Sequence, residues 1–202
     1  MKNNRNFLGI VSAVFLFSLF AFIPLEEKKI VVIDAAHGGN DAGADFGGGL
    51  QEKLIVERIA KLIQSQNKDS NLEIVLLRDG DHFMELSERV SIINKLNPGL
   101  VISLHANASK DIAKNGTEAY IATNGKFYNQ SKENAENLLQ KVAVENLSKG
   151  NVSEANFFIL KKSNCPAVTL EVGYLSNEKD RKYITSEKGQ TEIAEKILEA
   201  IK

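Results

Sequence analysis

Residues 30–66, IVVIDAAHGGNDAGADFGGGLQEKLIVERIAKLIQSQ, contain a strand–loop–helix unit that sets the architecture of the chain. Ile30–Ala35 is a short β-branched and apolar run, which is typical of a buried strand. A glycine-rich loop, His37–Gly49, follows it. Leu50–Gln66 then repeats leucine and isoleucine at the spacing of an amphipathic helix. This order predicts a sheet whose strands are joined by helices.

The same alternation continues to the C-terminus. Further strands are predicted at Leu72–Leu77, Leu100–Leu104, Gly116–Ala122, Asn156–Leu160 and Ala167–Val172. Further helices are predicted at Leu86–Leu96, Glu133–Leu147, a short segment from Glu178 capped by Asn177, and Glu187–Ile201, with a polar loop at Thr123–Lys132. Strands alternating with helices predict a single-domain, three-layer α/β fold with a mainly parallel sheet covered on both faces.

Four side chains that can carry chemistry lie at the expected ends of these elements. His37 follows the first strand, His105 follows the third, Glu171 ends a late strand, and Glu52 begins the first helix. Ligands gather beyond the carboxyl ends of strands in open α/β sheets, so we expect these side chains to converge. Two imidazoles and a carboxylate suit zinc and leave a position for water. A further carboxylate could then transfer protons.

Each of these residues also has a purely structural explanation. A histidine after a strand is often only a hydrogen-bonding group, and Glu52 could simply complement the helix dipole. Glu171 is harder to explain structurally, because it interrupts the apolar run PAVTLEVGYL, where an unpaired charge is costly. The third histidine, His82, follows no strand and is expected to be solvent-exposed. Cys165, the one cysteine, is expected to be a buried small side chain.

The glycine-rich loop and the overall charge exclude several nucleotide-related functions. Gly49 is followed by Leu-Gln-Glu, so the loop does not end in the Gly-Lys-Ser/Thr of a phosphate-binding loop. Its acidic residues would also repel a pyrophosphate. The net charge is −1 and no basic run is present, so no nucleic-acid partner is expected.

The N-terminus predicts export. Lys2 and Arg5 precede an apolar stretch, Phe7–Leu25, so residues 1–27 are interpreted as a signal peptide or an uncleaved N-terminal signal anchor. Both alternatives place the rest of the chain in the periplasm or cell envelope. Membrane contact is expected only if residues 7–25 remain attached as an anchor.

Beyond these patterns, the sequence resembles the zinc-dependent N-acetylmuramoyl-L-alanine amidases that split septal peptidoglycan. Four blocks carry the resemblance in the right order. They are VVIDAAHGGNDAGA (31–44), QEK (51–53), LLRDGDHFMELSERVSIINKLNPGLVISLHANAS (76–109) and NCPAVTLEVGYLSN (164–177). Together they span nearly everything after the N-terminal segment.

The resemblance implies a zinc amidase catalytic domain at residues 28–202. It implies one zinc ion held by His37, Glu52 and His105, and a catalytic Glu171. It also implies a twisted, mostly parallel sheet of about six strands with helices on both faces. The implied activity is hydrolysis of the amide between N-acetylmuramic acid and L-alanine in peptidoglycan, used in wall remodelling and daughter-cell separation, with an envelope activator protein as a candidate partner.

Two features depart from the family pattern. The first block usually carries Pro-Gly before the histidine, where this chain has Ala35-Ala36. Several relatives also insert a long helical segment that blocks the zinc, whereas residues 122–156 offer only a polar stretch and one helix. Autoinhibition of that kind is therefore not expected here.

Three other functions stay open on the sequence alone. The chain could be a catalytically silent, amidase-like protein that binds peptidoglycan or a division partner. It could be a metal-free glycoside hydrolase that uses Glu52 and Glu171, which would leave both histidines without a role. It could also be a zinc peptidase that cleaves within the stem peptide.

Overall fold

The computed structural model describes residues 28–144 and 146–202. The predicted signal peptide or anchor, residues 1–27, lies outside the described residues. Within the described residues, no helix has both the length and the apolar character needed to cross a membrane.

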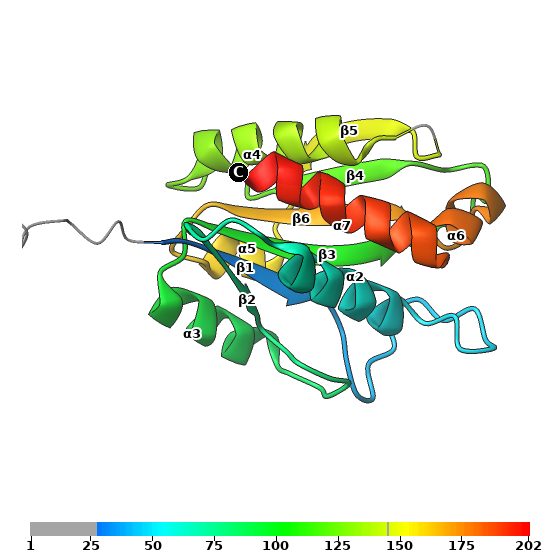
Figure 1. Ribbon diagram of the computed structural model, residues 1–202, viewed down its shortest axis with the longest axis horizontal. Helices are drawn as coiled ribbons and strands as arrows, with labels where there is room; N and C mark the ends of the chain where they lie inside the picture. Colours follow the sequence, from blue (N-terminus) through cyan, green and yellow to red (C-terminus); the bar gives the residue numbers. More distant parts are fainter. Residues whose placement is uncertain (1–27, 145) are drawn as a thin grey trace, which may run out of the picture.

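Strands and helices alternate along the chain as predicted (Figure 1). The strands are β1 (Lys29–Ala35), β2 (Leu72–Leu76), β3 (Leu100–Asn107), β4 (Thr117–Ile121), β5 (Lys149–Glu154) and β6 (Ala167–Tyr174). The helices are α2 (Glu52–Gln66), α3 (Leu86–Leu96), α4 (Tyr128–Val142), α5 (Phe158–Lys162), α6 (Glu178–Ile184) and α7 (Glu187–Ile201).

The strands form one six-stranded sheet in the order β2-β1-β3-β6-β4-β5. All neighbouring pairs are parallel except β4 and β6, which are antiparallel. The prediction of a single α/β domain with a mostly parallel sheet is therefore confirmed. Strands β1, β3 and β6 are parallel neighbours, so the chain segments that carry His37, His105 and Glu171 lie side by side.

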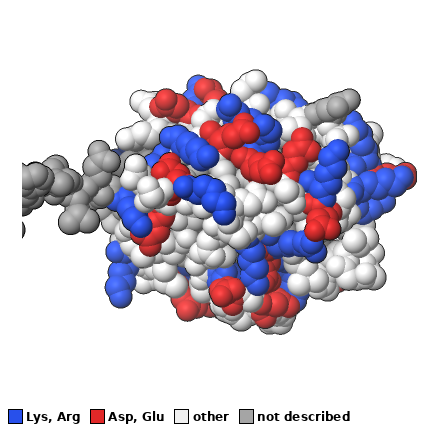
Figure 2. Space-filling view, viewed as in Figure 1, with Lys and Arg blue, Asp and Glu red and all other residues white. Residues whose placement is uncertain are grey.

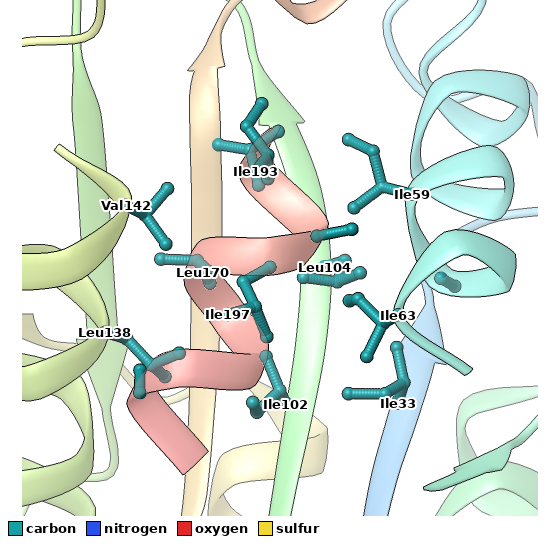
Figure 3. Close-up of a cluster of buried hydrophobic side chains, with 14 of the residues drawn as sticks. Ile33, Ile59, Ile63, Ile102, Leu104, Leu138, Val142, Leu170, Ile193 and Ile197 are labelled. Atoms are coloured by element: carbon teal, nitrogen blue, oxygen red, sulfur yellow. The ribbon is translucent and has the colours of Figure 1, made fainter. Parts of the chain in front are cut away.

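One face of the sheet is covered by α2, α7 and α4. Figure 3 shows Ile193 and Ile197 of α7 between Ile59 and Ile63 of α2 on one side and Leu138 and Val142 of α4 on the other. The same cluster contains sheet residues, which include Ile33, Ile102 and Leu170. This cluster is the larger of the two cores, because each helix buries a full apolar stripe.

The opposite face carries a smaller core under α3 and α5. Val32, Val101 and Ala167 pack there against Val90 and Ile93 of α3 and Ile159 and Leu160 of α5. Two residues further along each strand the side chains become polar. Helices therefore cover only part of this face, and the polar part faces a cleft.

Three elements differ from the sequence prediction. The run Asn156–Leu160 was predicted to be a strand, but from Phe158 onward it belongs to α5, because Ile159 and Leu160 bury themselves against α3 rather than in the sheet. Strand β5 was missed, since KGNVSE is a largely exposed edge strand with no apolar pattern. Helix α4 begins at Tyr128 and ends at Val142 instead of spanning 133–147, because its first turn is polar.

Charges of both signs are mixed on the face viewed in Figure 2, over the elements α2, α4 and α7. This mixture agrees with the net charge of −1.

The larger core predicts a stability effect at α7. Ile197 is fully buried between α2 and α4. We expect Ile197→Ala to lower the free energy of unfolding by about 2–5 kcal/mol, because it removes buried methyl groups and leaves a cavity. The measurement is urea unfolding followed by circular dichroism. The matched control is Glu195→Ala on the exposed face of the same helix, expected to change stability by less than about 0.5 kcal/mol. Equal effects of the two substitutions would contradict this packing.

Candidate metal centre

The register of the sheet lines up polar side chains on the partly covered face. Ser103 on β3 is paired with Asp34 on β1 and with Thr169 on β6. One step further, Glu171 on β6 is paired with His105 on β3 and with Glu118 on β4. Directly paired residues point to the same face of a sheet, so these side chains form two adjacent polar rows.

The structure brings together His37, Glu52 and His105. Glu52 lies between the imidazoles, with its Oε2 3.2 Å from His37 Nε2 and its Oε1 3.0 Å from His105 Nδ1. One nitrogen or oxygen ligand atom from each residue lies within 4.8 Å of the other two. The ring centroids of the histidines are 5.2 Å apart. A small cation could contact all three side chains.

The Glu52 carboxylate is held in place by backbone donors. Its Oε2 accepts a hydrogen bond from Ala44 N at 2.9 Å, and its Oε1 accepts one from Ala106 N at 3.0 Å. Gly43 makes this approach possible. Its φ is +65°, and a Cβ there would lie 2.5 Å from Glu52 Oε2 and 2.7 Å from His37 Cδ2. The glycine-rich loop therefore serves the site by letting its backbone pass close to these two side chains.

The electrostatics of this group suit a cation. Burial would raise the pKa of Glu52, but hydrogen bonds from His105 and His37 outweigh it and hold that pKa well below its usual range. Burial opposes a charged His37, yet Glu52 and Asp41 raise its pKa to about 9. The pKa of His105 is also raised, against burial, by Glu52 and Glu171. Several acidic groups thus favour positive charge at this point.

His37 is presented by a strained turn. Its φ is +61°, in the left-handed region that is unusual for a residue other than glycine. The buried guanidinium of Arg78 fixes the turn from one side, because its Nε donates to Ala35 O at 2.9 Å and its Nη2 to Ala36 O at 3.2 Å. The peptide oxygens at the positions where Ala35-Ala36 replaces Pro-Gly are therefore both hydrogen-bonded.

Arg89 fixes the same turn from the other side. Its Nη2 donates to His37 O at 2.6 Å, and its Nη1 donates to Ala35 O at 3.0 Å. Its charge is paired with the buried carboxylate of Asp34, which also accepts a hydrogen bond from Ser103 Oγ at 2.7 Å. Such a strained turn persists only where its surroundings determine it, and Arg78 and Arg89 supply those contacts.

Glu171 lies in the row beside His105, and its carboxyl group is buried and has a raised pKa. Its Oε2 is buried and has no hydrogen-bond partner among the described residues. Burial raises the pKa of Glu171 to about 7, with a smaller opposing effect from His105 and reinforcement from Glu52 and Glu118. A carboxyl group with a pKa near neutrality can take up and release protons at working pH.

The polar rows open into a cleft of about 540 Å³. His37, His105 and Glu171 line it, together with Asp34 and Ser103 beneath them. The rim is apolar and is formed by residues next to α3 and α5. The cleft is large enough for part of a polymeric substrate to reach the three polar side chains.

The remaining sequence predictions have mixed outcomes. His82 is exposed and Cys165 is buried, both as predicted; burial raises the pKa of the Cys165 thiol to about 11. His105 and Glu171 were expected to follow or end their strands, which is wrong. Both lie within strands, because β3 continues to Asn107 and β6 to Tyr174.

Sequence reasoning missed two groups at the site. Asp34 interrupts the first apolar run and forms the buried pair with Arg89, and an acidic residue in such a run was the available signal. Glu118 on β4 is paired with Glu171 on β6, and it accepts hydrogen bonds from Tyr120 Oη at 2.9 Å and Asn107 Nδ2 at 3.2 Å. No local pattern marks it, because its position depends on antiparallel pairing.

The three clustered residues fit a zinc ion. Imidazole nitrogen and carboxylate oxygen are ligands that zinc accepts, and three protein ligands are typical of its catalytic sites. Hydrogen bonds from Ala44 and Ala106 orient the carboxylate, and Asp41 Oδ2 lies 2.9 Å from His37 Nδ1, which would orient that imidazole. Such outer contacts are typical of metal-binding side chains.

The sequence of this chain was compared with family models and with known proteins, and both comparisons find amidases. The sequence model of the family described as N-acetylmuramoyl-L-alanine amidase matches residues 31–202. N-acetylmuramoyl-L-alanine amidase AmiC of Neisseria meningitidis is 26% identical over 87% of this chain and 52% of its own length. This chain therefore spans about half of that relative.

Solved structures of amidases have the same fold as this chain. The catalytic domain of CwlV, an N-acetylmuramoyl-L-alanine amidase from Bacillus (Paenibacillus) polymyxa var. colistinus, is 35% identical with a TM-score of 0.78, covering 86% of this chain and 96% of that one. The CwlD amidase of Clostridioides difficile, solved in complex with the GerS lipoprotein, is 27% identical with a TM-score of 0.77, again over 86% and 96% of the two chains.

Proposed function

The chain belongs to the N-acetylmuramoyl-L-alanine amidase family, and we propose that it is a zinc-dependent enzyme that hydrolyses the amide between N-acetylmuramic acid and L-alanine in peptidoglycan. The single observation that carries the zinc proposal is the cluster of His37, Glu52 and His105 beside Glu171. One zinc ion would be held by those three residues, and residues 28–202 would form the catalytic domain.

Zinc bound there would supply a Lewis acid that lowers the pKa of water and polarises the amide carbonyl. Glu171 accepts a proton from the attacking water as the water oxygen bonds to the carbonyl carbon. The carbon–nitrogen bond then breaks, and Glu171 delivers the proton to the departing L-alanine nitrogen. The pKa of Glu171, about 7, supports both steps, because one group must act first as base and then as acid.

The contacts of Glu52 argue against the glycoside hydrolase alternative. That reaction needs two carboxyl groups free to act on opposite sides of a glycosidic bond. Glu52 instead contacts both imidazoles and accepts backbone hydrogen bonds from Ala44 and Ala106. Its low pKa also makes it a poor proton donor. A silent binding protein and a stem peptidase remain alternatives for experiment.

Cellular role and partners are part of the same proposal. Residues 1–27 would export the domain to the periplasm or cell envelope as a signal peptide or anchor, and the activity would serve wall remodelling and daughter-cell separation. An envelope activator protein is a candidate partner, and the complex of CwlD with the GerS lipoprotein supports a protein partner of some kind. Helix α4 lies within residues 122–156, where several relatives insert a blocking segment. It packs on the sheet face opposite the cleft, so it does not cover Glu171.

Mass spectrometry of digested peptidoglycan tests the function. The purified protein is incubated with zinc, and separately with a chelator. Free stem peptides with an intact L-alanine amino terminus, formed only with zinc, are expected. Cleavage within the glycan or inside the stem would replace the proposal with one of the two hydrolase alternatives, and binding without products would favour the silent protein.

The hydrogen bonds by which Arg78 and Arg89 hold the His37 turn, here called the clamp, lead to a further prediction about metal affinity. Arg89→Lys keeps the charge but cannot bond Asp34, Ala35 O and His37 O together. We expect zinc affinity to fall about 10- to 100-fold, as is typical when a residue that orients a ligand is changed. Competition with a chelating dye measures it.

The matched control is Arg58→Lys, the same change on the exposed face of α2, which should leave zinc affinity unchanged. Thermal unfolding of the metal-free proteins separates loss of affinity from loss of fold. Wild-type affinity in a folded Arg89→Lys protein would contradict the clamp.

A further inference from the structure

The cleft has an apolar rim that the proposed chemistry does not use. Four large apolar side chains line it while remaining exposed, namely Phe83 (46%), Leu86 (50%), Phe157 (46%) and Phe158 (40%). Only three other large apolar side chains are comparably exposed in residues 28–144 and 146–202, and they lie elsewhere. We call these four residues, three of which are phenylalanines, the aromatic rim. Their concentration at one cleft indicates a binding surface.

The aromatic rim comes from two separate elements. Phe83 and Leu86 lie just before α3 and at its first residue, and Phe157 and Phe158 lie at the start of α5. Both helices cover the same sheet face, and they leave the row of His105 and Glu171 open to the cleft. The rim thus extends from the reactive side chains onto two helices.

Part of the rim is supported by an aromatic contact. The rings of Phe157 and Tyr120 have centroids 5.4 Å apart and are tilted by 55°. Tyr120 is itself fixed by its hydrogen bond to Glu118. A ring held in this way presents its free surface at little cost in side-chain entropy when a ligand binds.

The charge of the cleft indicates which part of a peptidoglycan substrate, the stem peptide or the glycan strand, binds at the aromatic rim. Stem peptides carry free carboxylates, whereas the glycan strand is uncharged. The ionisable groups at the cleft outside the reactive cluster include the acidic Asp41 and Glu85. Arg89 also lines it, but its guanidinium is already committed to Asp34 and to backbone oxygens. An anionic stem finds no free cation among these lining residues.

We propose that the aromatic rim is a subsite for the neutral glycan strand that flanks the scissile amide. Pyranose rings have apolar C–H faces, and these would stack on the phenyl rings, while the lactyl amide reaches Glu171. This assignment rests on the proposed amidase function, because it takes peptidoglycan as the substrate. It predicts that the enzyme recognises the sugar on this side of the cleft and extends the stem peptide away from it.

The test measures binding of an uncharged oligosaccharide of β-linked N-acetylglucosamine, which has the pyranose faces of the glycan strand and lacks the lactyl carboxylates that removal of the stem peptides would expose. This oligosaccharide contains no amide between N-acetylmuramic acid and L-alanine, so it is not cleaved and the assay is independent of turnover. Isothermal titration compares the wild-type protein with Phe157→Ala and Phe158→Ala. Each substitution is expected to weaken glycan binding about 2- to 12-fold, which corresponds to the loss of one stacked ring. Phe157→Tyr keeps the ring and is expected to restore binding.

Phe46→Ala is the matched control. Phe46 is exposed to the same extent as Phe157, at 46%, but lies in the glycine-rich loop near Arg181. It should bind glycan like the wild type. On polymeric peptidoglycan, the rim variants should raise KM with kcat unchanged, because the rim contacts no reacting atom.

Wild-type glycan binding by both rim variants would overturn the subsite. Loss of binding to free stem peptides, with glycan binding retained, would overturn it as well and assign the rim to the stem. These outcomes are distinct from failure of the proposed function, since amide cleavage is scored separately by mass spectrometry.

Discussion

Glu171→Gln is expected to lower the turnover of peptidoglycan by about 10²- to 10⁴-fold, the usual contribution of a general acid–base group. Glutamine has nearly the same shape but can neither accept nor return the proton. Zinc content should stay at the wild-type value, because the proposed ligand atoms of His37, Glu52 and His105 are untouched. Turnover is followed by release of stem peptides, and zinc content by metal analysis of the same samples.

The matched control is Glu118→Gln, on the adjacent strand. Glu118 faces Glu171 in the sheet, but it is already hydrogen-bonded to Tyr120 and Asn107. Its substitution should cost far less activity. Near-normal turnover by Glu171→Gln, or a larger loss in Glu118→Gln, would move the proton-transfer role away from Glu171.

A pH profile gives a second signature of the same role. Burial raises the pKa of Glu171 to about 7, and only the ionised form can accept the proton from water. Activity should therefore rise with pH through an acidic limb and reach a plateau once Glu171 is ionised. A bound dication would favour the ionised form and shift that limb below pH 7. The limb should be lost from the residual activity of Glu171→Gln.

The convergence of the site could be predicted because it depends on strong, local signals. The apolar runs that became β1, β3 and β6 are buried strands, and each is followed or interrupted by a polar residue that apolar strands rarely tolerate. Parallel neighbours then bring such residues to one region of the sheet. Helix α3 was predicted with the correct bounds, since Asn97-Pro98-Gly99 ends it sharply.

The parts that were missed depend on contacts that are distant in sequence. Glu118 reaches Glu171 only because β4 runs antiparallel to β6, and nothing in the local pattern of β4 gives its direction. Strand β5 pairs with β4 at the edge of the sheet, and its sequence has no apolar alternation that would mark it as a strand. The run Asn156–Leu160 is apolar enough to be predicted as a strand, and burial of Ile159 and Leu160 against α3 places them in a helix instead.

Removing a proposed ligand tests the candidate metal centre most directly. His105→Ala is expected to lose zinc as well as turnover, whereas Glu171→Gln loses turnover alone. Changing a residue that merely orients a ligand already weakens metal binding about 10- to 100-fold, so loss of a ligand should exceed that range. Without His105, Glu52 also loses the partner 3.0 Å from its Oε1. Zinc per protein and peptidoglycan turnover are measured together, with circular dichroism to establish that the variant is folded.

The control for this experiment is His82→Ala, which removes an exposed imidazole outside the cluster. It should keep both zinc and activity, because its side chain contributes nothing to the cleft. The pair therefore separates a loss of one specific ligand from a general effect of removing histidine. A folded His105→Ala protein that retained stoichiometric zinc and near-normal turnover would exclude His105 from the metal centre. Glu171 would then need another electrophilic partner, because a proton-transfer group alone does not polarise an amide carbonyl.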